Sequence, residues 1–208
     1  MGLLYYEYYG FGDTMAYHLD AIKLSDLALV DTSTYMEILL GKSLPLEAVD
    51  FAYYNQPRAF FLIKILSVVH LVSGQNYWVS GLYFSLFSFS GFWMLASSLV
   101  RYFPSIRLGV IVALLLFPSV VFWSSGIVKE SIAMGAMMLL IKLLIDWMLS
   151  RKMNWKRVII SALLVAIVWH LKYYYLGVLL ITAIPLIITD VIVKNRRIKI
   201  NAYVVYGM

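Results

Sequence analysis

Long uncharged, apolar runs alternate with short basic clusters over most of this chain. Residues 78–100, 108–128 and 173–193 each have about the 20 residues that a helix needs to cross the hydrocarbon core of a membrane. Residues 131–149 form another run, which contains Lys142 and Asp146, and residues 158–171 form a shorter one. The pattern predicts a bundle of about five transmembrane helices.

Three basic clusters separate the runs, at 101–107, 150–157 and 194–199. Lys and Arg gather in the cytoplasmic loops of membrane proteins. Placing all three clusters in the cytoplasm puts the connections around 123–130 and 170–175 on the outer side. The acidic segment 1–57 then also lies outside.

Residues 59–74 are apolar but span only about 24 Å as a helix, and they contain Lys64 and His70. If this helix crossed the membrane, every later loop would invert and the basic clusters would face outward. We therefore predict an interfacial, juxtamembrane helix at 58–76. It follows an extracytoplasmic acidic loop segment at 1–57 and precedes the transmembrane bundle at 77–208.

Composition excludes a soluble domain. The 208 residues are 62% hydrophobic and 13% charged, whereas soluble domains carry about 25% charged residues. We predict an all-α integral membrane protein. The net charge of +6 comes from basic clusters between apolar runs, which is not the basic stripe of a nucleic-acid-binding protein. With no Cys, disulfides and thiolate metal sites are excluded.

Two patterns inside the runs predict packing. Gly81, Ser85 and Ser88 share one face of the first run, where small side chains allow helices to approach closely. Lys142 and Asp146 are four residues apart, so they are predicted to neutralise each other on one helix face.

Carboxylates and cations converge on the predicted outer face. A carboxylate can take a proton from an attacking hydroxyl group, and Lys and Arg can neutralise a phosphate. Each candidate also has a structural interpretation. Asp13 follows Gly12 and could form a turn, Glu130 could be an acid favoured at a helix start, and a Lys at an interface could simply snorkel. The candidates are Asp13, Tyr17, Arg58, Lys129, Glu130, His170 and Lys172.

The order of four short motifs resembles the GT-C class of membrane glycosyltransferases, which includes protein O-mannosyltransferases and aminoarabinose transferases. The motifs are YYGFGDTMAYHLDA (8–21), NQPRAFFLIKIL (55–66), FPSVVFWSSGIVKES (117–131) and WHLKYYYLGVLL (169–180). The chain departs from the class pattern at Thr14, where a second acid is usual, and at Lys129, where Pro is common. The first span and the later part of the class have no counterpart, so we expect a truncated bacterial member.

The resemblance implies that a sugar moves from a polyprenyl-phosphate donor to a glycan, lipid or protein acceptor at the outer face of the bacterial cytoplasmic membrane. It implies that Asp13 is the catalytic base and that Glu130 lies beside the donor phosphate or a divalent metal. Lys129, Lys172, Tyr17, His170 and Arg58 would bind substrate. Two alternatives stay open: a polysaccharide polymerase or ligase with the same donor, and a non-catalytic membrane subunit or transporter fragment.

Overall fold

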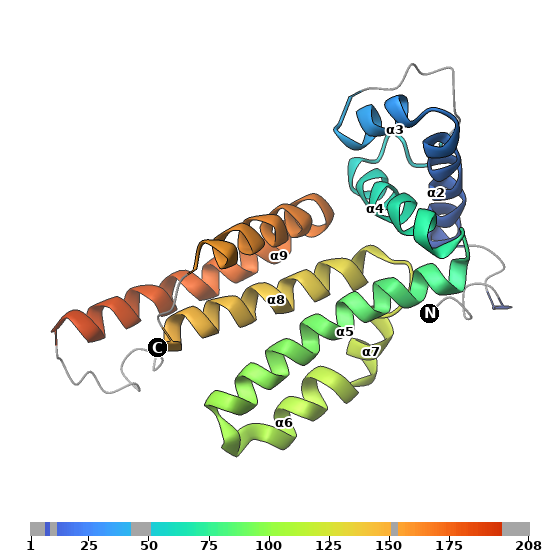
Figure 1. Cartoon of the computed structure of the whole chain (residues 1–208). Coiled ribbons are helices and arrows are strands. Elements are labelled where there is room, and N and C mark those ends of the chain that lie inside the picture. Colours follow the sequence, from blue (N-terminus) through green and yellow to red (C-terminus); the bar gives the residue numbers. More distant parts are fainter. Residues whose placement is uncertain (1–6, 9–11, 43–50, 151–153, 197–208) are drawn as a thin grey trace.

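The computed structural model describes residues 7–8, 12–42, 51–150 and 154–196, and all regular structure in these ranges is helical. Long helices form a bundle, and a smaller group of helices, α2 to α4, is attached at one end of it (Figure 1). Three helices are long and apolar enough to cross a membrane: α5 (Tyr77–Tyr102), α8 (Lys129–Ser150) and the Trp155–Asp190 part of α9 (Trp155–Arg196). This agrees with the predicted helical membrane protein.

Helices α5 and α8 touch through their backbones. A Cβ atom added to Gly91 would lie 2.3 Å from the carbonyl oxygen of Gly135, and one added to Gly135 would lie 2.8 Å from the Cα atom of Ser88. The Ser85 hydroxyl accepts a hydrogen bond of 2.9 Å from the backbone N–H of Gly126. The small-residue face predicted on α5 therefore does face α8 and the loop before it.

A polar contact joins the same two helices near their other ends. The predicted pair of Lys142 and Asp146 is confirmed, with Nζ 2.9 Å from Oδ2. Ser98 of α5 donates to the second oxygen of the Asp146 carboxylate at 2.6 Å. The carboxylate is buried, and its two oxygens are satisfied by these two side chains.

The run 108–128, which we expected to form one span, is broken. It is divided into α6 (Arg107–Ile111), the π-helical η2 (Val112–Leu116) and α7 (Pro118–Trp123), after the 3₁₀ turn η1 (Pro104–Ile106). The break lies at Phe117, which is extended with ψ 122°, because a proline disfavours helical geometry in the residue before it. The pieces lead back from the far end of α5 to the start of α8 (Figure 1).

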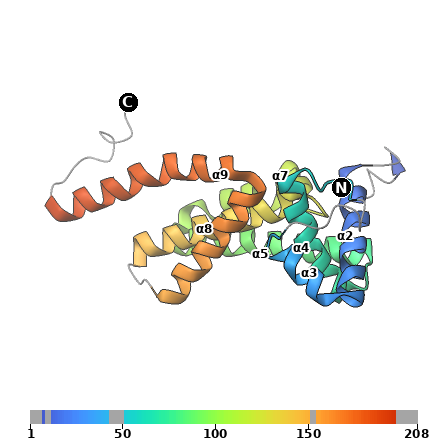
Figure 2. The ribbon, with the colours of Figure 1, turned by 90° about the horizontal axis from the view of Figure 1, so that it is seen from above.

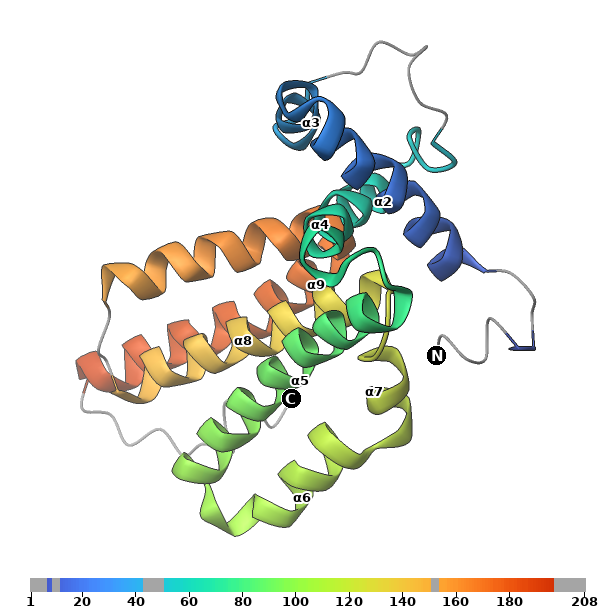
Figure 3. The same ribbon diagram turned by 45° about the vertical axis from the view of Figure 1, so that its right-hand side comes forward.

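Helix α9 is kinked at Lys172, whose φ of −148° and ψ of 68° are not helical. The kink falls between the two predicted runs 158–171 and 173–193. Figures 2 and 3 show the chain turning back at this point, so that the two arms of α9 run in opposite directions. The two expected runs are therefore separate arms of one kinked helix.

The acidic segment forms helices where we expected a loop. Its described part holds α2 (Asp13–Val30) and α3 (Thr32–Leu39). Tyr17, Ala21 and Leu24 recur at helical spacing and are at most 2% exposed, in a core shared with α4. This apolar stripe, within a segment whose charged residues are mostly acidic, makes α2 a helix.

Helix α4 (Pro57–Ser73) matches the helix predicted at 58–76. It starts with proline at its first turn and ends at Gly74, whose φ of 61° favours glycine. It contacts α2, α5 and α9. Figure 3 looks nearly along α4 while α5 and α8 are seen lengthwise, so α4 crosses the direction of the bundle. Its position at a membrane interface stays a prediction.

Candidate functional site

The candidate residues gather at one end of the bundle. The start of α8, the kink of α9 and the α2–α4 group lie at this end, whereas the turn between α5 and α6 and the end of α8 lie at the opposite one (Figure 1). The length of the helices thus separates Lys129, Glu130 and Lys172 from the basic cluster at 101–107. This is the separation that the basic-cluster pattern predicted.

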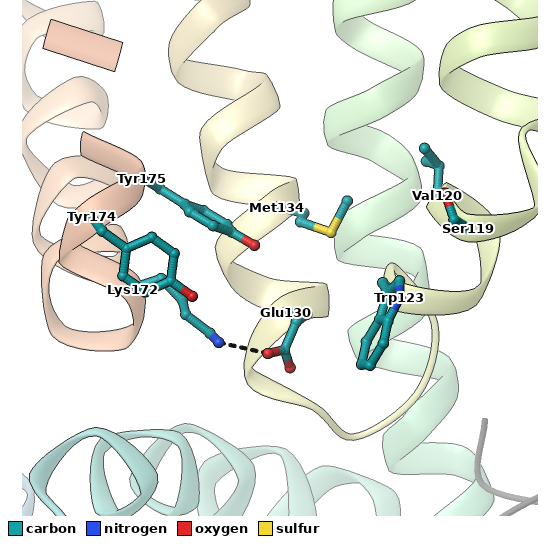
Figure 4. A pocket seen from close by; sticks show the side chains of 8 residues that line it. All are labelled: Ser119, Val120, Trp123, Glu130, Met134, Lys172, Tyr174 and Tyr175. Carbon is teal, nitrogen blue, oxygen red and sulfur yellow. Dashed lines mark ion pairs between the residues drawn. The ribbon is translucent and has the colours of Figure 1, made fainter. Parts of the chain in front are cut away.

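Glu130 and Lys172 form an ion pair in the wall of a pocket. The Lys172 Nζ atom lies 2.6 Å from Glu130 Oε1, and their side chains are only 19% and 23% exposed. The pocket has a volume of about 330 Å³ and opens between α7, α8 and α9 (Figure 4). Its lining consists of Ser119, Val120, Trp123, Glu130, Met134, Lys172, Tyr174 and Tyr175.

Aromatic rings surround this ion pair. The ring of Tyr174 lies 5.6 Å from the Lys172 ammonium, and the hydroxyl group of Tyr175 points into the pocket (Figure 4). Trp123 forms the wall next to Glu130 on the other side. A few convergent polar groups among aromatic side chains are typical of small-molecule sites.

Asp13 lies in a neighbouring cluster that Lys129 connects to α8. The Tyr53 hydroxyl donates a hydrogen bond of 2.8 Å to Asp13 Oδ1. The Tyr17 and Tyr53 ring centroids are 4.9 Å apart. The Lys129 ammonium lies 5.3 Å from the centroid of the Tyr17 ring. Asp13 does not line the pocket of Glu130, so the predicted sharing of one cavity by the two carboxylates stays a prediction.

Electrostatics couples the two clusters. Burial raises the pKa of Tyr17 well above its usual value, and the negative charges of Asp13 and Glu130 add to the increase. Both carboxylates attract the Lys129 ammonium, while Lys172 and Arg58 repel it. The five charged groups therefore form one electrostatic unit around the starts of α2, α4 and α8 and the kink of α9.

Asp20 holds the Tyr53 end of this unit in place. Its carboxylate accepts backbone hydrogen bonds from Ala52 at 3.2 Å and Tyr53 at 3.1 Å, and it is 1% exposed. Burial, followed by the hydrogen bond to Asp13, raises the pKa of Tyr53 to about 12, so its hydroxyl keeps the proton that it donates. Sequence reasoning did not select Tyr53 or assign this role to Asp20, because both depend on a contact between segments about 30 residues apart.

The two remaining candidates lie around the kink of α9. The Arg58 guanidinium stacks over the Tyr173 ring at 4.6 Å. His170 stacks on Phe61, with ring centroids 4.8 Å apart, and lines a different pocket. The structure thus separates His170 from the pocket of Glu130 and Lys172.

Comparison with known proteins adds no family. The sequence matches no protein-family model, no curated protein and no solved structure. Among the described residues, no group of three or more His, Cys, Asp or Glu side chains is placed to hold a metal ion. The site must therefore be interpreted from its own chemistry.

Proposed function

We propose that this protein acts as a membrane glycosyltransferase that uses a polyprenyl-phosphate sugar as donor. The observation that carries the proposal is the charge arrangement at one end of the bundle. There, two carboxylates lie among three cations, beside an aromatic pocket bounded by helices that are apolar on their other faces. A donor with a lipid tail, an anionic phosphate and a sugar has the complementary chemistry.

In the proposed reaction, an acceptor hydroxyl group attacks the anomeric carbon of the sugar. The bond between that carbon and the phosphate oxygen breaks, and its electron pair leaves with the lipid phosphate. Lys172, Lys129 and Arg58 would stabilise the charge on that leaving group. Asp13 would take the hydroxyl proton, with Tyr53 orienting its carboxylate.

Glu130 has a supporting role in this scheme. Its ion pair fixes the Lys172 ammonium at the pocket wall, where the lipid phosphate would bind. Tyr17 would complete the site by holding Lys129 next to the Asp13 cluster. His170 lies outside this site and has no role in the proposed transfer.

We further propose five crossings: α5, the broken α6–α7 segment, α8 and the two arms of α9. The positive-inside pattern supports an outward-facing site in the bacterial cytoplasmic membrane.

A transporter would need ionisable groups or broken helices at the membrane midplane. In the described part of the chain, the Lys142–Asp146 pair is neutralised and also bonded by Ser98, so it offers no free charge to a substrate, which favours the interfacial enzyme; the break of the α6–α7 segment at Phe117 is a feature that a transporter would share. A polymerase or ligase would share the donor and differ in its acceptor.

The decisive experiment replaces Asp13 by Asn in the native cell. We expect transfer to fall by at least about 100-fold, because the general base is lost. The surface glycan should lose one sugar, and the matching polyprenyl-phosphate sugar should accumulate in lipid extracts measured by mass spectrometry. Asp26→Asn, on the same helix, is the matched control and should leave both unchanged. Normal transfer by a membrane-inserted Asp13→Asn protein contradicts the assignment.

A further inference from the structure

A second pocket, of about 520 Å³, lies between the end of α3, the start of α4 and α9. The charged and aromatic members of its lining are Lys42, Tyr54, Phe60, Phe61, Lys64 and His170. The volume is within the range of ligand sites, about 300–1,000 Å³. None of its lining residues belongs to the pocket of Glu130 and Lys172.

Lys64 is the notable group in this pocket. No carboxylate in the described part of the chain lies within ion-pair distance of its ammonium, which lies 5.3 Å from the centroid of the Phe60 ring. Burial lowers the pKa of Lys64. The other lysine of the pocket, Lys42, is paired with Glu37 at 2.7 Å. Among the described residues, the pocket therefore contains one cation without a carboxylate partner.

His170 supplies a second polar group. Its ring is held by stacking on Phe61, and Nδ1 bonds the backbone carbonyl of Ala166 at 2.8 Å. A carbonyl oxygen can only accept, so Nδ1 carries a proton. The second ring nitrogen, Nε2, can then accept a hydrogen bond from a hydroxyl group of a ligand.

The surroundings of the pocket suit a membrane surface. Trp169 and Tyr173, on either side of His170 in α9, are 60% and 47% exposed. Leu40, in the pocket rim, is 79% exposed. Exposed aromatic side chains at the end of a membrane helix are typical of the headgroup level. An occupant with an anionic head and an apolar tail would cover the rim and pair with Lys64.

We propose that this pocket binds the phosphate headgroup of an anionic phospholipid of the bilayer, with Lys64 as the principal cation. The lipid would link α3, α4 and α9, since each contributes to the pocket. This site is independent of the proposed transferase activity, and its test requires no turnover.

The test measures lipid retention by the purified full chain with native mass spectrometry. The probes are phosphatidylglycerol and phosphatidylcholine at equal concentrations, with inorganic phosphate as competitor. We expect the chain to retain phosphatidylglycerol preferentially. Lys64→Met, which keeps most of the side-chain volume, should weaken retention about tenfold, the effect of losing one charge-assisted contact. Lys64→Arg should keep it.

The matched control is Lys156→Met, which removes an exposed lysine from the start of α9 and should not change retention. The proposal would be overturned by equal retention of the two lipids, by undiminished retention by a folded Lys64→Met protein, or by an equal loss in the Lys156→Met control. Displacement by millimolar inorganic phosphate would identify a free anion as the ligand and exclude the phospholipid. If Lys64→Met does not fold, retention by Lys64→Arg decides the outcome in the same assay.

Discussion

The ion pair between Glu130 and Lys172 is predicted to hold the kink of α9 against the start of α8. Lys172 is the non-helical residue of α9, so the backbone around it lacks part of the helical hydrogen bonding. The ion pair crosses from this point to α8 at 2.6 Å (Figure 4). Removing either charge should therefore loosen the junction of the two helices.

The burial of the Glu130–Lys172 pair determines how much each substitution should destabilise the protein. Exposed ion pairs contribute about 0–1 kcal/mol, and removing one partner of a fully buried pair costs about 3–5 kcal/mol. The two side chains are 19% and 23% exposed, so this pair lies between the two cases. We expect Glu130→Gln and Lys172→Met each to lower the free energy of unfolding by about 2 kcal/mol.

A double-mutant cycle isolates the interaction. The free energy of unfolding is measured in mixed micelles by far-UV circular dichroism for the parent, both single variants and the double variant. The double variant should be less destabilised than the sum of the two single variants, by about 1–2 kcal/mol, because no unpaired charge remains. Additivity within about 0.5 kcal/mol would refute a stabilising pair.

Two further predictions concern packing and pH. Gly91→Ala should lower the free energy of unfolding by about 1–3 kcal/mol in the same assay, because the added Cβ atom meets the backbone of α8. Gly177→Ala, which has open space around it, is the control. Equal effects of the two substitutions would contradict the close approach of α5 and α8. Burial, and then the neighbouring His18, lower the pKa of His70 to about 4, while the backbone of Ala21 and the charge of Asp26 act in the opposite direction. The His70 Nε2 atom lies 3.1 Å from Nδ1 of His18. Because the pKa of His70 is lower in the folded than in the unfolded protein, acid favours the unfolded state. The free energy of unfolding should therefore be fully present above about pH 6.5 and fall towards pH 4, with a loss of about 1–2 kcal/mol at pH 5. His70→Gln should flatten this dependence, and an unchanged slope would show that another group titrates.

The helical class and most helix positions could be predicted from the sequence because hydrophobic runs and basic clusters are local signals. The break at Lys172 and the pair of Lys142 with Asp146 follow from the same kind of pattern. The break between α6 and α7 was not predicted, because hydrophobicity does not report backbone geometry, which Pro118 determines here. Helix α2 was missed because its acidic residues hid a buried stripe that includes Tyr17.

From the sequence, the candidate site could be predicted only as a set of residues on the outer face of the predicted bundle. The pairing of Glu130 with Lys172 needs the turn of α9 to bring the kink back to α8, and no periodicity encodes that direction. The hydrogen bond from Tyr53 to Asp13 needs Asp20 to hold the turn at residues 52–53. The separation of His170 from the pocket of Glu130 and Lys172 also depends on a contact between distant segments, since His170 stacks on Phe61 of α4.

Helix α4 is the element that holds the α2–α4 group, which carries Asp13, against the bundle. It packs on α2, which carries Asp13, and on α9, where Arg58 reaches Tyr173. The bundle alone would present Glu130, Lys129 and Lys172 without Asp13 and Arg58, and the α2–α4 group alone would present Asp13 and Arg58 without Lys129 and Lys172. The proposed transfer, which needs a base on one side of a sugar and cations at the phosphate on the other, would require both groups. In that proposal the buried, almost uncharged face of α4 acts through position, by keeping the two groups in contact.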